Sequence, residues 1–202
     1  IVMDEPTLPY DFCDEIIRNG DLEESSTEPV HWQQFRTSIW LARGKGVGGS
    51  NALAAGRSSG ELTQPIPIQC SKEGYTYEDT AKVRVVDHQT GQTVVCDHRI
   101  ERCPVITIRT HRFVHAGRMG LEQDSEGFQT IRGTFTMTGK FERSGNHFTI
   151  SFANNYRIFV DNVSMRLLSK PVEDVAASFS LDGEVESVTV RDGLFHSSVA
   201  SK

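Results

Sequence analysis

Residues 19–23 read Asn-Gly-Asp-Leu-Glu, and residues 158–163 read Ile-Phe-Val-Asp-Asn-Val. Both stretches place carboxylates inside or beside apolar residues, where an unpaired charge carries a high desolvation cost. Asp161 shares its alternation with Phe159 and Val163, so we expect its side chain to point towards the core. Chemistry leaves two explanations open: the carboxylates bind a cation, or they bond to backbone amides or an arginine. We interpret the stretches as two ends of the folded part that meet in space and share a calcium ion.

The composition is that of one ordinary domain, or one domain with a tail. The chain has 202 residues, of which 37% are hydrophobic and 24% charged, enough apolar content for a sizeable core. Since no apolar run approaches the roughly 20 residues that span a bilayer, we expect no membrane insertion. The net charge of -6 gives no basic signature for nucleic acid.

Four cysteines, at positions 13, 70, 96 and 103, include no CxxC pair. Their even number in a strand-rich chain favours two disulfides and a secreted or cell-surface protein. Cys96 and Cys103 flank a short polar segment and are expected to bridge a hairpin, which leaves Cys13 for Cys70. The alternative is four reduced, buried thiols in a cytosolic protein.

Short alternating patterns predict strands along most of the chain. Residues 35–41 alternate in the manner of one half-buried strand, and residues 75–87 and 92–96 flank a turn typical of a hairpin. Within residues 103–113, Ile106 and Ile108 lie on one face and polar residues on the other. Because no window shows a convincing helix, the sequence predicts an all-β sandwich.

The predicted organisation has three parts. Residues 1–18 are expected to form an N-terminal arm, and residues 19–168 the sandwich. Pro171 follows the last long strand, and residues 169–202 are expected to be a C-terminal extension or linker that could add one or two strands.

Other motifs have weaker support. Residues 44–49 match GxGxxG, but no helix long enough for a dinucleotide site follows, so a flexible turn is expected. Asn162-Val163-Ser164 is an N-glycosylation acceptor sequence within an apolar strand, where a glycan is expected to have little room. No arrangement of nucleophile and base favours an enzyme.

Five segments, taken in order, resemble carbohydrate-binding modules of the family 4/9/16/22 type. They are residues 19–23 with Val30-His31-Trp32, residues 49–57, residues 74–77, residues 133–135 and residues 159–164. The resemblance implies a jelly-roll β-sandwich of the galactose-binding-like type with a structural calcium ion. It also implies the calcium ligands: the backbone carbonyl of Asp21, the side chain of Glu23, the carbonyl of Asn51, and Asp161.

The resemblance further implies a cleft in which sugar rings stack on aromatic side chains. This chain departs from the family where platform tryptophans are common, since Lys82 follows one signature and Ser58-Ser59-Gly60 follows Arg57. Basic residues are present instead, in two rows of shared alternation. If the rows face the same way, they form a basic strip suited to an acidic or sulfated glycan. The candidate glycan-binding residues are Trp40, Arg57, Lys82, Arg84, Arg109, His111 and Phe113.

These observations predict a secreted, non-catalytic module that binds a polysaccharide, either as a monomer or as part of a larger protein. One alternative is an extracellular adhesion or receptor-type β-sandwich that binds a protein partner. Another is a polysaccharide lyase or hydrolase built on a jelly roll.

Overall fold

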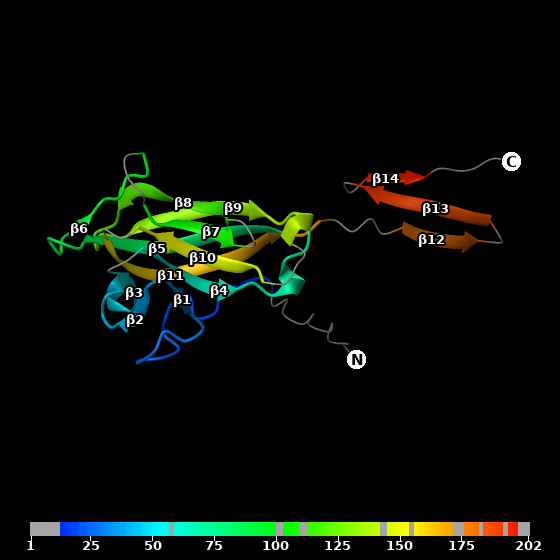
Figure 1. Cartoon of the computed structure of the whole chain (residues 1–202). Coiled ribbons are helices and arrows are strands. Elements are labelled where there is room, and N and C mark those ends of the chain that lie inside the picture. The colour runs from blue at the N-terminus through cyan, green and yellow to red at the C-terminus, as the bar shows by residue number, and fades with distance from the viewer. Residues whose placement is uncertain are drawn as a thin grey trace, which may run out of the picture. The chain divides into compact units, whose positions relative to one another are not determined.

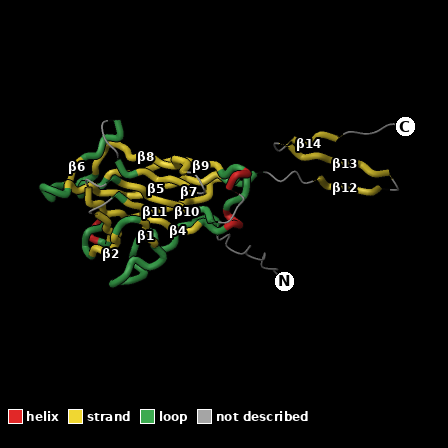
Figure 2. Tube along the Cα trace, viewed as in Figure 1, coloured by secondary structure: helices red, strands yellow, loops and turns green. Residues whose placement is uncertain are grey.

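The computed structural model describes residues 13–56, 59–99, 103–109, 113–141, 145–153, 156–171, 176–181, 184–191 and 194–197. The chain divides into two compact units, Ile1–Ser169 and Lys170–Lys202. Strands dominate both, as Figure 2 shows. Within these ranges, no helix has the length and apolar character to cross a membrane.

Eleven strands of the described chain build the first unit (Figure 1). They are β1 (Gln33–Phe35), β2 (Ser38–Ala42), β3 (Ala52–Gly56), β4 (Gly60–Pro65), β5 (Thr76–Asp87), β6 (Thr93–Val94), β7 (Val105–Arg109), β8 (Phe113–Gln123), β9 (Gln129–Thr136), β10 (His147–Phe152) and β11 (Tyr156–Ser169). Short 3-10 turns are η1 (Val47–Gly49), η2 (Ile68–Cys70) and η3 (Gly139–Phe141).

The strands form one antiparallel path that folds into two layers. Its order is β1-β4-β10-β7-β8-β9-β5-β11-β3-β2, with β6 beside β5. The path turns at β8, which pairs with β7 through residues 113–118 and with β9 through residues 118–123. We call the two sides the β4–β10–β7 layer and the β5–β11–β3 layer. The result is the predicted all-β jelly-roll sandwich.

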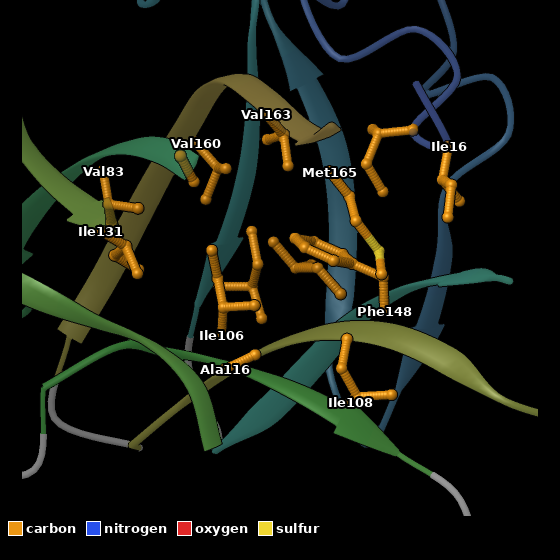
Figure 3. Close-up of a cluster of buried hydrophobic side chains, with 14 of the residues drawn as sticks. Ile16, Val83, Ile106, Ile108, Ala116, Ile131, Phe148, Val160, Val163 and Met165 are labelled. Atoms are coloured by element: carbon orange, nitrogen blue, oxygen red, sulfur yellow. The ribbon is translucent and has the colours of Figure 1, made fainter. Parts of the chain in front are cut away.

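The core lies between these layers, and Figure 3 shows their side chains converging. Ile106, Ile108 and Phe148 come from the first layer, and Val83 and Val160 from the second; all five are fully buried. Burying an aliphatic or aromatic side chain of this size contributes roughly 1.5–3 kcal/mol to folding. The predicted core face of residues 106 and 108 is confirmed.

The single strand expected at residues 35–41 is instead two strands. Arg36 has a φ of 59°, in the left-handed region, and turns the chain between β1 and β2. β1 then pairs with β4 and β2 with β3, so the two halves enter opposite layers. Alternation alone does not reveal such a turn, because both halves keep the same pattern.

The expectation that Asp161 points to the core is wrong. Asn162 has a φ of 48°, and the pairing of β11 with β5 shifts register between Asp161 and Ser164. This bulge changes which face each residue occupies. Ile158 and Val160 are core residues before it and Val163 after it, so Asp161 lies on the outer face of its layer, beside Lys82.

Both predicted disulfides are present. Cys13 joins Cys70, and Cys96 joins Cys103. The first bridge ties residues 13–18, part of the predicted arm, to the sandwich. This segment also runs along β11, where the Ile16 amide donates to the Met165 carbonyl at 3.0 Å.

The second unit contains β12 (Ala176–Leu181), β13 (Glu184–Arg191) and β14 (Leu194–Ser197), an antiparallel sheet in that order. The C-terminal extension therefore holds three strands where the sequence suggested one or two. Among the described pairings, these strands bond only to one another.

Candidate calcium site and glycan-binding face

The two stretches expected to meet do so. The Val163 amide donates to the Gly20 carbonyl at 2.9 Å. A Cβ on Gly20 would lie 2.0 Å from the Val163 carbonyl oxygen, so this approach requires glycine. We call residues 19–23, 46–51 and 161–163 the clasp.

Asp161 is the buried carboxylate of the clasp, with 1% of its surface exposed. Its Oδ2 accepts hydrogen bonds from the Val47 amide at 2.8 Å and the Ser50 hydroxyl at 2.7 Å, and its Oδ1 accepts one from the Asn162 amide. Burial raises the pKa of Asp161, the three hydrogen bonds lower it, and the carboxylate of Glu23 raises it further. The charge of Glu23 thus disfavours the ionised form of Asp161.

Both carboxylate oxygens of Glu23 accept hydrogen bonds from Asn51. Its Oε1 accepts from the Asn51 amide at 2.7 Å, and its Oε2 accepts from the Asn51 side-chain nitrogen at 3.1 Å. Asp161 and Glu23 thus both accept hydrogen bonds from backbone amides, which is one of the two explanations that the sequence left open. No lysine or arginine within the described ranges forms an ion pair with either of them.

In the clasp, neutral oxygen atoms also lie close to the Asp161 carboxylate. A Cβ on Gly46 would lie 2.2 Å from the Asn51 carbonyl oxygen, 2.3 Å from the Ser50 hydroxyl and 2.5 Å from Asp161 Oδ2. Carboxylate and carbonyl oxygens are the donors that calcium prefers. Because the described chain holds no cluster of three or more His, Cys, Asp or Glu side chains suited to a metal, a cation here would depend on carbonyls. With carbonyl oxygens as additional ligands, the residues present fit calcium.

The predicted basic strip is not assembled. Lys82 and Arg84 belong to β5 and Arg109 to β7, and β8 and β9 separate these strands in the sheet order. The sequence pattern gives the face of each strand but not its neighbours, so the prediction that the two rows form one strip is wrong.

Lys82 and Arg84 instead bond to loops that lie on the outer face of the β5–β11–β3 layer. Lys82 pairs with Asp124 at 3.3 Å. The Arg84 guanidinium lies 4.8 Å from the centre of the Phe128 ring and 4.9 Å from that of Phe159, and it donates to the Lys45 carbonyl at 2.8 Å.

The other candidates are scattered. Trp40, 40% exposed, lies on β2 opposite Ala54. Phe113 begins β8 in register with Arg109. Arg57 and His111 lie outside the described residues.

A pocket of about 400 Å³ opens on the β4–β10–β7 layer. The Arg109 guanidinium lies 4.8 Å from the centre of the Phe35 ring and donates to Glu61 at 2.8 Å. Phe35 remains 39% exposed, as a surface on which a planar or ring-shaped group can stack. The pocket is lined by Gln33, Gln34, Phe35, Thr63, Arg109, Gly145 and His147.

A row of threonines crosses the same face. Thr149 pairs with Thr63 on one side and with Thr107 on the other, so all three share the face that Thr63 presents to the pocket. They are at least 93% buried, and their hydroxyls have no hydrogen-bond partner among the described residues. Neither this row nor Phe35 was among the binding residues predicted from the sequence. The signal was a threonine between apolar residues, as in Ile106-Thr107-Ile108.

No family model and no curated protein matches the chain. Solved structures do, and they define its class as the jelly-roll fold of carbohydrate-binding modules, as the five motifs predicted.

One is the C-terminal family 22 module of Clostridium thermocellum Xyn10B, with a TM-score of 0.58 and 7% identity over 80% of this chain and 99% of that one. Another is a family 16 module, with a TM-score of 0.52 and 17% identity over 74% and 98%. A third is the CBM22-1 xylan-binding domain of Paenibacillus barcinonensis Xyn10C, with a TM-score of 0.53 and 9% identity over 69% and 86%. At these identities the likeness establishes the fold.

Proposed function

We propose that the protein is a secreted, non-catalytic module that binds a polysaccharide on the outer face of the β4–β10–β7 layer. The observation that carries this proposal is the open pocket on this face, in which the exposed ring of Phe35 lies beside the guanidinium of Arg109. Concave sites with an aromatic surface and a few polar groups are typical of ligand binding.

Phe35 and Arg109 each offer a ligand in the pocket a different kind of contact. The exposed Phe35 ring offers apolar surface to one face of a sugar, and aromatic contacts of this kind dominate many binding sites. Arg109 offers donors to sugar hydroxyls or to an acidic group. Two disulfides in a chain of this size support an oxidising, extracellular setting.

A preference for acidic glycans is the finer part of the proposal. Fewer basic residues support it than the sequence suggested. Lys82 and Arg84 bond elsewhere, and Arg109 forms an ion pair with Glu61. Arg109 and His147 remain as the basic groups of the pocket. We propose that a uronic or sulfated sugar binds at this end.

Calcium completes the proposal as a structural ion. Glu23 and Asp161 would supply two negative charges, and the carbonyls of Asp21 and Asn51 neutral oxygens. Burial is the main cause that raises the pKa of Asp161, and the charge of Glu23 adds to it, so a cation beside the two carboxylates would favour their ionised forms. The ion would hold the clasp together and take no part in binding the glycan.

A glycan array followed by calorimetry tests the binding face. Phe35→Ala is expected to weaken affinity by tenfold or more, since it removes stacking surface without opening the core. Trp40→Ala, an equally exposed aromatic on β2, should bind as the wild type does. Comparing neutral xylan with xylan that carries uronic-acid groups tests the acidic preference, which Arg109→Gln should abolish.

Other outcomes favour other functions. Binding to no glycan on the array would contradict the proposal and favour the protein-binding alternative. New reducing ends or unsaturated products after incubation with polysaccharides would show a hydrolase or a lyase. Equal losses for Phe35→Ala and Trp40→Ala would place the binding site elsewhere.

A further inference from the structure

Asn162 stands in the acceptor sequence Asn162-Val163-Ser164, and no other Asn-x-Ser/Thr sequence occurs in the 202 residues. The apolar surroundings suggested that a glycan would have little room there. The structure gives a different environment. Asn162 is exposed, although its neighbours Asp161 and Val163 are 1% and 5% exposed.

The bulge in β11 is the cause of this exposure. The register with β5 jumps from Asp161 to Ser164, so Asn162 is an extra residue that the pairing does not use. Its φ of 48° lies in the left-handed region, which asparagine tolerates better than most residues. The side chain is therefore directed out of the strand rather than into the core or the sheet.

The other described asparagines differ from Asn162 in how they use their side chains. Asn19 donates to the Val30 carbonyl and Asn51 to Glu23. Asn146 donates to the Phe141 carbonyl and to Ser71. Asn162 has no such bond to any described residue, so a substituent on its amide nitrogen would break no contact of the fold.

We propose that Asn162 is an N-glycosylation site, used when the chain passes through the endoplasmic reticulum. The amide nitrogen forms a bond to the anomeric carbon of an oligosaccharide carried on a lipid diphosphate. The bond from that carbon to the phosphate oxygen breaks, the lipid diphosphate leaves, and the amide gives up one proton to a base of the transferase.

Because Ser164 is engaged in the folded unit, the transfer is expected to precede folding. In the folded unit its hydroxyl donates to Glu15 at 2.5 Å, so it is engaged with the segment docked on β11. The unfolded chain presents the acceptor sequence free of this bond, and folding then leaves the glycosylated Asn162 at the surface.

The site also leaves the proposed binding face open. No residue of β11 lines the pocket, whose strand residues come from β1, β4, β7 and β10. The glycan is thus expected to coat the clasp end of the β5–β11–β3 layer without competing for the polysaccharide.

Expression of the full chain behind a signal peptide in a eukaryotic secretory host tests the site. A glycoprotein secreted in parallel shows that the host's transferase is active. Treatment of the secreted protein with peptide N-glycosidase in water labelled with oxygen-18 should place labelled aspartate at position 162 in most molecules. Asn162→Gln should lose the glycan, and Ser164→Thr should keep it together with the hydroxyl that bonds Glu15.

Two results would overturn the proposal. One is an unmodified Asn162 in secreted wild-type protein while the parallel glycoprotein is modified. The other is retention of the glycosylated chain inside the cell while Asn162→Gln is secreted, which would mean that the fold does not accommodate the glycan.

Discussion

The two outer faces of the sandwich differ in how they satisfy their polar groups. On the β5–β11–β3 layer, loops bond to the sheet and to one another: Arg84 donates to the Lys45 carbonyl, Lys82 pairs with Asp124, and the Gly48 amide donates to Glu126. On the β4–β10–β7 layer, the hydroxyls of Thr63, Thr107 and Thr149 have no hydrogen-bond partner in the described part of the chain, and Thr63 lines the pocket.

This difference separates two tasks on one scaffold. The covered face carries Asp161 and holds the clasp, so its polar groups have partners within the fold. The open face carries the pocket and the exposed Phe35 ring, where we propose that the ligand binds. Changes to each face test this division.

Removal of calcium should destabilise the covered face. A ligand at 1,000 times its dissociation constant stabilises a protein by about 4 kcal/mol. For a domain of this size, that corresponds to a fall in Tm of roughly 10 °C on chelation. Calorimetry with excess EDTA, and then with calcium or magnesium restored, measures it.

Asp161→Asn is the matched control for that measurement. It keeps the shape of the side chain and removes one charge, so its Tm should no longer respond to chelation. A wild-type Tm that is the same with and without EDTA would contradict the calcium proposal and leave the amide bonds as the whole clasp.

A second unpartnered group lies on the core side of the covered layer. Asp79 is fully buried, and neither of its carboxylate oxygens has a hydrogen-bond partner in the described chain. Burial raises the pKa of Asp79 to about 7, and the charges of Glu15 and Glu78 add to the effect. The unfolded chain releases this proton near pH 4, so folding takes up a proton between the two values.

Stability should therefore fall as the pH rises from 4 to 7, by at most about 4 kcal/mol from this group. Asp79→Asn should be more stable than the wild type at pH 8 and show little gain at pH 4. Urea unfolding at both pH values measures the difference. An equal effect of the substitution at the two pH values would show that charge is not its cause.

On the open face, Thr149→Val should raise stability and leave binding unchanged. Removing the unsatisfied hydroxyl should raise stability by about 1 kcal/mol, and the fully buried side chain offers a glycan no accessible surface. Ser151→Ala, on the same strand and face but half-buried, should change neither. A Thr149→Val protein that is less stable than wild type would mean that the hydroxyl already has a partner.

The smallest effect is expected for Lys82→Ala on the covered face. Its partly exposed ion pair with Asp124 is worth about 0–1 kcal/mol. Glycan affinity should be unchanged, although this lysine is a candidate binding residue from the sequence. A tenfold loss of affinity, measured by calorimetry, would move the binding site to the covered face.

Local sequence predicted those parts of the molecule that short patterns determine. The family motifs predicted the jelly roll, spacing predicted both disulfides, and alternation gave the correct faces of Ile106 and Ile108. The meeting of Gly20 with Val163 also followed from the sequence, because glycine and the flanking carboxylates are local signals.

The errors arose where one residue changes the geometry. Arg36 and Asn162 adopt left-handed backbone conformations that move the following residues to another layer or another face. Alternation continues unchanged through such a residue, so Asp161 was placed on the wrong side of its strand. Which strands lie side by side is a property of the whole fold, and that is why the basic strip was predicted but not found.

The disulfide between Cys13 and Cys70 determines how the first unit bears mechanical load. Residues 14–16 bond to residues 165–167 in antiparallel register, so a pull on residues 13 and 169 would open those hydrogen bonds one after another, as in a zipper. The bridge carries force from Cys13 directly to Cys70, the last residue of η2, and so keeps the tension off those hydrogen bonds. A module held on a polysaccharide and pulled through its ends would thus resist at its covalent crosslink, and reduction would lower the force at which it opens.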